Sequence, residues 1–158
     1  MESQEYAKNS VIEIGTDIRN WIRVRHFDWW NFLLHAVPLP QGPDFNITEP
    51  EIKFHYLRAR WAGRANGHWC KYSVPHALVA REKYDSTIAH EVCHSFAHRL
   101  VGFNAKHGAL WHYLFQTVCG FTNEPMYWDK GSVEIKHVKL AKKLREIDKI
   151  KEQLSKLE

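Results

Sequence analysis

Two histidines and a glutamate lie at a spacing that could bind a metal ion and activate water. They form the pattern HExxH in His90-Glu91-Val92-Cys93-His94. On an α-helix, histidines four residues apart lie on one face, about 5 to 6 Å apart at Cβ, so both imidazoles can reach one ion. Glu91 points to another side of the helix, where its carboxylate can meet a metal-bound water without binding the metal. The pattern therefore indicates zinc-dependent hydrolysis.

The motif requires a helix, and the surrounding residues predict one. Asp85 or Ser86 is suited to cap its N-terminus. Gly102 is placed to end it, because glycine readily adopts the left-handed conformation found after helix C-termini. Apolar residues recur every four positions in between, at Ile88, Val92, Phe96 and Leu100.

A catalytic zinc takes three protein ligands and keeps one position open, so a third ligand must come from elsewhere in the chain. His98 lies on the same helical stripe, but about 12 Å from His90 along the axis, which predicts a packing or supporting role. His107 follows Gly102, where the chain can reverse and return from the start of a second helix, Gly108–Cys119. His107 is therefore the preferred third ligand.

The order of these residues resembles the SprT/Spartan family of zinc metalloproteases. That family has HExxH, a short reversal, and then HG followed by an aromatic residue. Here the run His90–His94 is followed, thirteen residues on, by His107-Gly108 and then by Trp111. Upstream, Ala62-Gly63-Arg64-Ala65 resembles the AGRA-like stretch that precedes the family's active-site helix. The resemblance covers about residues 52–120.

The resemblance implies an α+β fold with a zincin-like minimal metalloprotease core, mostly helical, with a small β-sheet beside the active-site helix. One Zn²⁺ would be held by His90, His94 and His107, with Glu91 as the catalytic base. The implied substrates are proteins, including proteins attached to or bound near DNA. Many SprT-like proteins continue into a cysteine-rich zinc ribbon, but this chain has no CxxC pair. It therefore resembles a compact form of the family.

Length and composition predict one soluble domain. The chain has 158 residues, of which 44% are hydrophobic and 13% aromatic, enough for a single core. No stretch of about 18 uncharged apolar residues predicts a membrane span, and the N-terminus lacks the pattern of a signal peptide. The scattered cysteines Cys70, Cys93 and Cys119 favour reduced thiols. We expect a protein that is not secreted and has no membrane partner, cytoplasmic or, if DNA-associated, nucleoid or nuclear.

Residues 1–135 are predicted to form the SprT-like domain. Apolar spacing predicts N-terminal helices within residues 4–37, one ending near Arg25 and the next beginning near Asp28. Alternating residues predict a strand from Ile52 to about Trp61. Asn66-Gly67 predicts a hairpin turn before a returning strand at His68–Val74. An exposed edge of such a sheet could bind an extended peptide by strand addition.

Residues 136–158 are predicted to form a basic amphipathic helix. This segment has eight Lys or Arg against four Asp or Glu, 8 − 4 = +4, which equals the formal net charge of the whole chain. Lysines on its polar face could bind DNA, or the helix could pack on the body with that face in solvent. Self-association through this helix is a further alternative.

Two classes of function remain open from the sequence. The first is a zinc endopeptidase, in which Tyr113, Tyr127 or His112 could help to stabilise the developing oxyanion. The second is a DNA- or protein-binding module stabilised by a fully ligated zinc, with His98 or Glu124 as the fourth ligand. Glu124 could also replace His107 as the third ligand of the enzyme. The intact Glu91 favours the endopeptidase, because a structural site does not use that carboxylate.

Overall fold

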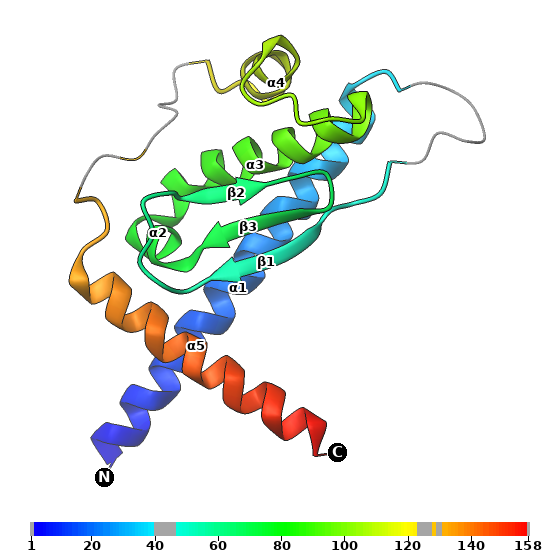
Figure 1. The fold of residues 1–158 in the computed structure, drawn as a ribbon. Helices are drawn as coiled ribbons and strands as arrows, with labels where there is room; N and C mark the ends of the chain where they lie inside the picture. Colours follow the sequence, from blue (N-terminus) through cyan, green and yellow to red (C-terminus); the bar gives the residue numbers. More distant parts are fainter. Residues whose placement is uncertain (1, 40–46, 123–127, 129–130, 158) are drawn as a thin grey trace.

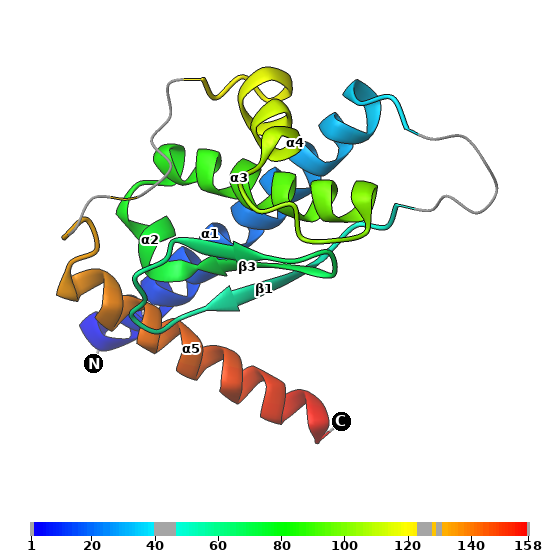
Figure 2. The ribbon, with the colours of Figure 1, turned by 45° about the horizontal axis from the view of Figure 1, so that its top comes forward.

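The computed structural model describes residues 2–39, 47–122, 128 and 131–157, with side chains from Glu13 onwards (Figure 1). Its helices and one small sheet form an α+β fold, as expected. The central helix α3 lies between the sheet on one side and the α4 segment on another, with α1 running behind it (Figures 1 and 2). The elements are α1 (Glu2–Ala36), β1 (Glu51–His55), β2 (Gly63–Ala65), β3 (Trp69–Ser73), α2 (Val74–Val79), α3 (Arg81–Val101), α4 (Ala109–His112), the π-helix η1 (Tyr113–Val118) and α5 (Ile135–Lys156).

The N-terminal part is one helix and not the two predicted ones. Asp28, expected to start a second helix, lies inside α1 and pairs with Arg25 at 3.2 Å, three residues away on the same face. No proline interrupts α1, and Ile22, Trp30 and Leu33 are all buried in the core. Burial of one continuous stripe therefore outweighs the local capping signal.

The sheet has the strand order β1-β3-β2. The predicted turn at Asn66-Gly67 is confirmed, because it joins the antiparallel strands β2 and β3, with the Asn66 side chain accepting N–H bonds from His68 and Trp69. The predicted strand from Ile52 to Trp61 is too long, since β1 ends at His55. The chain then crosses to the other edge of the sheet, so that β1 pairs with β3 in parallel. This pairing has no local sequence signal, because it joins segments on either side of a crossover.

The helix that carries the HExxH pattern, α3, begins earlier than predicted. It starts at Arg81, and neither Asp85 nor Ser86 caps it. The Asp85 carboxylate instead accepts hydrogen bonds from Arg25 and Trp29 of α1, a tertiary contact that takes the place of the capping role. The end of α3 is as predicted: Gly102 has a φ of 79°, and its N–H donates to the carbonyl of His98.

The helix after the reversal is only partly α-helical. The expected segment Gly108–Cys119 begins as α4 and widens into the π-helix η1. Phe115 of η1 stacks on Trp111 of α4, at 5.0 Å between ring centroids. Phe115 also meets the ring of His90 edge-on at 5.4 Å. The π turn therefore lies beside the histidines. Such turns are often found at functional sites.

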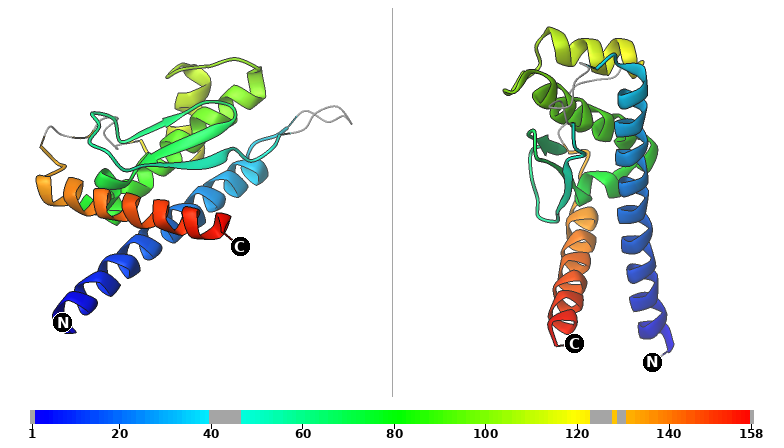
Figure 3. Two further views of the ribbon diagram at one scale, coloured as in Figure 1. Left: turned by 60° about the horizontal axis from the view of Figure 1, so that its bottom comes forward. Right: turned by 90° about the vertical axis from the view of Figure 1, so that its right-hand side faces the viewer.

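The C-terminal helix α5 crosses α1 and contacts α2 (Figure 3). Leu144 is fully buried at the crossing, directly over Gly15 of α1. The far end of α5 leaves the body, and Leu157 is 83% exposed. The first half of α5 therefore packs on the body of the protein, which is one of the arrangements expected for this helix. In the described part of the chain, no helix has the combination of length and apolar character needed to cross a membrane.

Candidate metal centre

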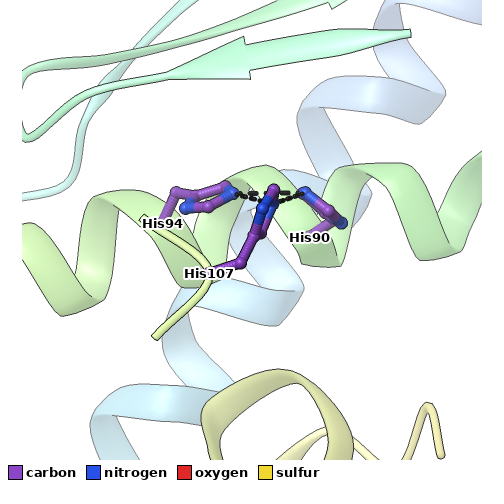
Figure 4. Close-up of side chains that lie close together, drawn as sticks. All are labelled: His90, His94 and His107. Atoms are coloured by element: carbon purple, nitrogen blue, oxygen red, sulfur yellow. Dashed lines mark hydrogen bonds between the residues drawn. The ribbon is translucent and has the colours of Figure 1, made fainter. Parts of the chain in front are cut away.

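Three histidines from two segments converge on one point (Figure 4). His90 and His94 come from one face of α3, and His107 comes from the loop that follows it. The Nε2 atoms are 3.1 Å apart between His90 and His107, 3.1 Å between His94 and His107, and 3.2 Å between His90 and His94. The predicted convergence of these three residues is therefore confirmed.

The triangle of nitrogens fits a metal ion and does not fit a hydrogen-bonded cluster. A neutral imidazole has one N–H and one lone pair, so three Nε2 atoms that all face one another cannot satisfy every pair. One cation can accept all three lone pairs. Tetrahedral ligands at about 2.0 to 2.1 Å from zinc are about 3.3 Å apart, close to the separations in this structure. His90, His94 and His107 can therefore hold a metal ion.

Burial keeps these imidazoles neutral and ready to bind. It lowers the pKa of His90 to about 3, with further lowering from His94 and His107 nearby. Burial likewise lowers the pKa of His94 to about 4, and His107 adds to that effect. The pKa of the more exposed His107 is also lowered, by burial and then by His112. At neutral pH the lone pairs are available, as metal binding requires.

The Trp111 side chain contacts the rings of all three histidines. It is fully buried, and its indole N–H donates to the carbonyl of His90 at 3.1 Å. Its ring stacks on His94 with 19° between the planes and meets His90 and His107 edge-on, each at 4.6 Å between centroids. One rigid side chain thus restricts the orientation of every candidate ligand.

The loop between α3 and α4 places His107 by backbone contacts. Lys106 has a φ of 52°, unusual for a residue other than glycine. The Asn104 side chain accepts the N–H of Lys106 at 2.9 Å, and the N–H of Gly108 donates to the carbonyl of Ala105 at 3.1 Å. The reversal expected after Gly102 is therefore a compact turn that presents His107 to α3.

Glu91 lies beside the histidines and under the edge strand β2. Its Oε1 is 3.8 Å from Nε2 of His90, and only 5% of its surface is exposed. A Cβ at Gly63 would lie 2.7 Å from Cγ of Glu91, so glycine is needed for this close approach. Burial raises the pKa of Glu91 to about 8. A bound cation would favour the carboxylate form.

A cleft of about 550 Å³ opens over the three histidines and Glu91. All three residues of β2 line this cleft. β2 is an edge strand, since it pairs with β3 on one side and with no strand of the described sheet on the other. The remaining lining comes from the loop before β2, from Trp69, from α3, from the His107 loop and from two aromatic residues. Apart from the three histidines and Glu91, the residues that line the cleft are Arg60, Trp61, Ala62, Gly63, Arg64, Ala65, Trp69, Ser86, Thr87, Asn104, Lys106, Phe115 and Trp128.

Other residues singled out in the sequence do not reach the cleft. The His98 ring packs against Gly67, where a Cβ would lie 2.9 Å from its Cδ2, so the packing role is confirmed. Tyr113 is 49% exposed, and neither Tyr113 nor His112 is among the residues that line the cleft, so their oxyanion role stays a prediction. The candidates Glu124 and Tyr127 lie outside the described residues.

Sequence reasoning missed two contributors to the site. Gly63 was visible only as part of a motif, and its steric role depends on how closely β2 approaches Glu91. Trp128 lines the cleft, and its indole N–H donates to the Thr87 hydroxyl at 2.9 Å. No spacing rule links Trp128 to α3, because the two are far apart in the chain.

Comparison of the chain with protein-family models, with curated proteins and with solved structures found no match. The case for a function therefore depends on the site itself.

Proposed function

We propose that this protein is a zinc-dependent endopeptidase of the SprT-like type with a zincin-like core. The observation that carries the proposal is the joint placement of three converging Nε2 atoms and a buried carboxylate 3.8 Å from one of them. Three nitrogen ligands leave a fourth position on a tetrahedral ion for water or substrate. The all-imidazole ligand set and the separation of the three nitrogens support zinc as the metal.

The roles of the residues follow from their positions. His90, His94 and His107 would hold the ion, and Trp111 would keep their rings in place. Zinc, when bound, polarises the scissile carbonyl and lowers the pKa of a coordinated water toward about 7. Glu91 would take the proton from the attacking water and deliver it to the leaving amine nitrogen. Its burial excludes bulk water from this proton transfer.

Substrate backbone would bind along the free edge of β2. An extended peptide can add to such an edge through main-chain hydrogen bonds. Gly63, at the start of β2, lies over Glu91, so a peptide on this edge would pass beside the catalytic base. This arrangement suits a polypeptide substrate and an internal peptide bond, because the cleft wall is a strand edge rather than a closed pocket.

Glu91→Gln tests the proposal most directly. The variant should bind zinc as the wild type does and should lose hydrolysis of an unfolded protein substrate by about 10³-fold or more, since only the proton acceptor is removed. Zinc content is measured by elemental analysis and hydrolysis by release of a fluorescent peptide. Equal activity in the variant would refute the role of Glu91.

Contact between α5 and DNA stays a prediction based on charge. Exposed lysines on this helix, among them Lys142, Lys149 and Lys151, could meet phosphates. If they do, DNA affinity falls steeply with salt and drops when residues 136–158 are replaced by a neutral helix. Salt-independent binding would contradict this role. A cytoplasmic location, or a nucleoid or nuclear one with DNA, belongs to the same proposal.

A further inference from the structure

The charged side chains that line the cleft are mostly of one sign. Arg60, Arg64 and Lys106 are basic, and Glu91 is the one carboxylate among the lining residues described. Glu91 is buried against the candidate ligands, so it does not offset the basic groups at the mouth of the cleft. A ligand that enters the cleft therefore meets a positive rim before it meets the catalytic base.

Within the described part of the chain, these basic groups form no ion pair with a carboxylate. Elsewhere the arginines Arg19 and Arg81 each face an aspartate, Asp148 and Asp17 respectively. By contrast, none of the three basic residues at the cleft has a carboxylate within 4.0 Å among the residues described. No acidic side chain among the residues described therefore neutralises the charge that they bring to the cleft.

The basic groups come from different segments that line the cleft. Arg64 extends from β2, with its guanidinium 4.6 Å from the centre of the Trp61 ring, which restricts its position. Lys106 comes from the loop after α3, next to the candidate ligand His107, and the Asn104 side chain accepts its backbone N–H. Because side chains alternate along a strand, Arg64 lies on the outer face of the sheet, whereas Gly63 faces Glu91. A peptide added to the edge of β2 would place alternate side chains beside Arg64.

The positive charge continues away from the cleft across the sheet. Arg64 of β2 is opposite Lys71 of β3, and Lys71 is opposite Lys53 of β1, so the three share one face. The amino groups of Lys71 and Lys53 lie 5.1 and 5.4 Å from the centre of the Trp69 ring. This row extends the attraction for negative groups beyond the residues that touch the metal-binding histidines.

We propose that this cleft selects polypeptide segments that carry carboxylates close to the scissile bond. The inference rests on the proposed peptidase function and names its substrate class. Arg60, Arg64 and Lys106 attract a carboxylate and repel a lysine or arginine at the same place, so they favour acidic segments over basic ones. The carboxylate comes either from Asp or Glu side chains or from the C-terminus of the substrate chain.

The binding test uses the full-length Glu91→Gln protein loaded with zinc, so that no peptide is consumed. Fluorescein-labelled peptides of one length carry glutamate, glutamine or lysine on both sides of a central apolar pair. Fluorescence anisotropy should give affinity in the order glutamate, glutamine, lysine, with about tenfold between the extremes at low salt and less at high salt. Each peptide is also made with a free and with an amidated C-terminus, which separates chain-end recognition from side-chain recognition.

Charge-reversed variants test the residues themselves. Arg64→Glu and Lys106→Glu should each invert the preference toward the lysine peptide, a result that loss of folding cannot produce. Arg64→Gln should give an intermediate preference. Lys151→Glu is the matched control, because it makes the same change in net charge on the exposed end of α5. It should leave the order of affinities unchanged. In the Glu91 enzyme the same preference should appear mainly in KM.

The outcomes separate this inference from the proposed function. Equal binding of the three peptides, together with their cleavage, overturns the inference and leaves the peptidase standing. The expected order of binding without any cleavage by the Glu91 enzyme supports the inference for the cleft and overturns the peptidase. Tighter binding of a single-stranded oligothymidylate of equal net charge, with loss on Arg64→Glu, would assign the basic rim to nucleic acid and overturn the inference.

Discussion

Polar groups on one side of α3 have hydrogen-bond partners within the chain, whereas those on the other side face one another without a full set of partners. Facing α1, Asp85 accepts hydrogen bonds from Arg25 and Trp29, so its charge is matched within the chain. Facing the cleft, His90 and His94 direct their Nε2 atoms toward a third imidazole that cannot satisfy them both. The first side stabilises the fold without a ligand, whereas the second can hold a metal ion. The difference separates residues that stabilise the fold from residues that can bind a metal ion.

The sharpest way to break this comparison is to remove the ligand that comes from outside α3. His107→Ala should lower zinc content well below one ion per chain and reduce hydrolysis by about 10³-fold or more, because two nitrogens hold zinc poorly. Elemental analysis and a peptide-cleavage assay measure both. His98→Ala is the control, and it should keep its zinc, since His98 packs against Gly67.

Zinc content of a Glu124→Ala variant tests the alternative in which Glu124 is the third ligand. If Glu124→Ala lost its zinc while His107→Ala kept it, the ligand set drawn here would be wrong. Full coordination by protein groups, measured by X-ray absorption of the zinc-loaded protein, would favour a structural zinc and a binding module.

A matched glycine substitution at the cleft should affect catalysis more than folding. Gly63→Ala places a Cβ 2.7 Å from Cγ of Glu91, whose side chain is buried and must move. A displacement of about 1 Å in a catalytic group can lower the rate by about 10²-fold. We expect a loss of about 10- to 100-fold in kcat with zinc retained and with a small change in the urea midpoint. An unchanged kcat would show that Glu91 tolerates the shift.

The same substitution at the α1–α5 crossing should do the opposite. Gly15→Ala places a Cβ 2.2 Å from Cδ2 of the fully buried Leu144, and overpacking of this kind costs about 1 to 3 kcal/mol. Urea unfolding should show the loss, whereas kcat and zinc content should stay the same. Leu144→Ala should cost less in the Gly15→Ala background than in the wild type, since it also removes the clash. Strictly additive effects of the two changes would contradict the steric explanation.

The smallest effect at neutral pH concerns a buried histidine away from the cleft. Burial lowers the pKa of His26 to about 4, and its Nδ1 lies 2.6 Å from the Tyr72 hydroxyl. The unfolded chain, with a histidine pKa near 6.5, binds the proton first, so stability is full above about pH 6.5 and falls as the pH drops toward 4. Below that pH the loss is on the order of 3 kcal/mol.

His26→Asn tests this effect. The free energy of unfolding of the metal-free variant should depend less steeply on pH than that of the metal-free wild type between about pH 7 and pH 4, by nearly one proton. His76, whose pKa is also lowered to about 4 by burial, titrates in both proteins and cancels in the difference. Identical slopes would mean that the pKa of His26 is the same in the folded and in the unfolded protein.

The features that the sequence predicted are local ones. The spacing of His90 and His94 places both on one face of a helix wherever that helix packs. Gly102 ends α3, and Asn66-Gly67 turns the hairpin, because the backbone preferences of these residues act over a few positions. The convergence of His107 could be predicted for the same reason, since only a short reversal separates it from the helix.

The features that only the tertiary structure decided join distant segments. Asp85 has the chemistry of a cap, yet its contacts with α1 place it inside α3. The parallel pairing of β1 with β3, the support of the histidines by Trp111 and the contact between Gly63 and Glu91 depend on how layers pack. Periodicity and turn chemistry act within a few residues, whereas these contacts depend on the shape of the whole core. The sequence determined which histidines can hold an ion, and the packing determined the cleft around them.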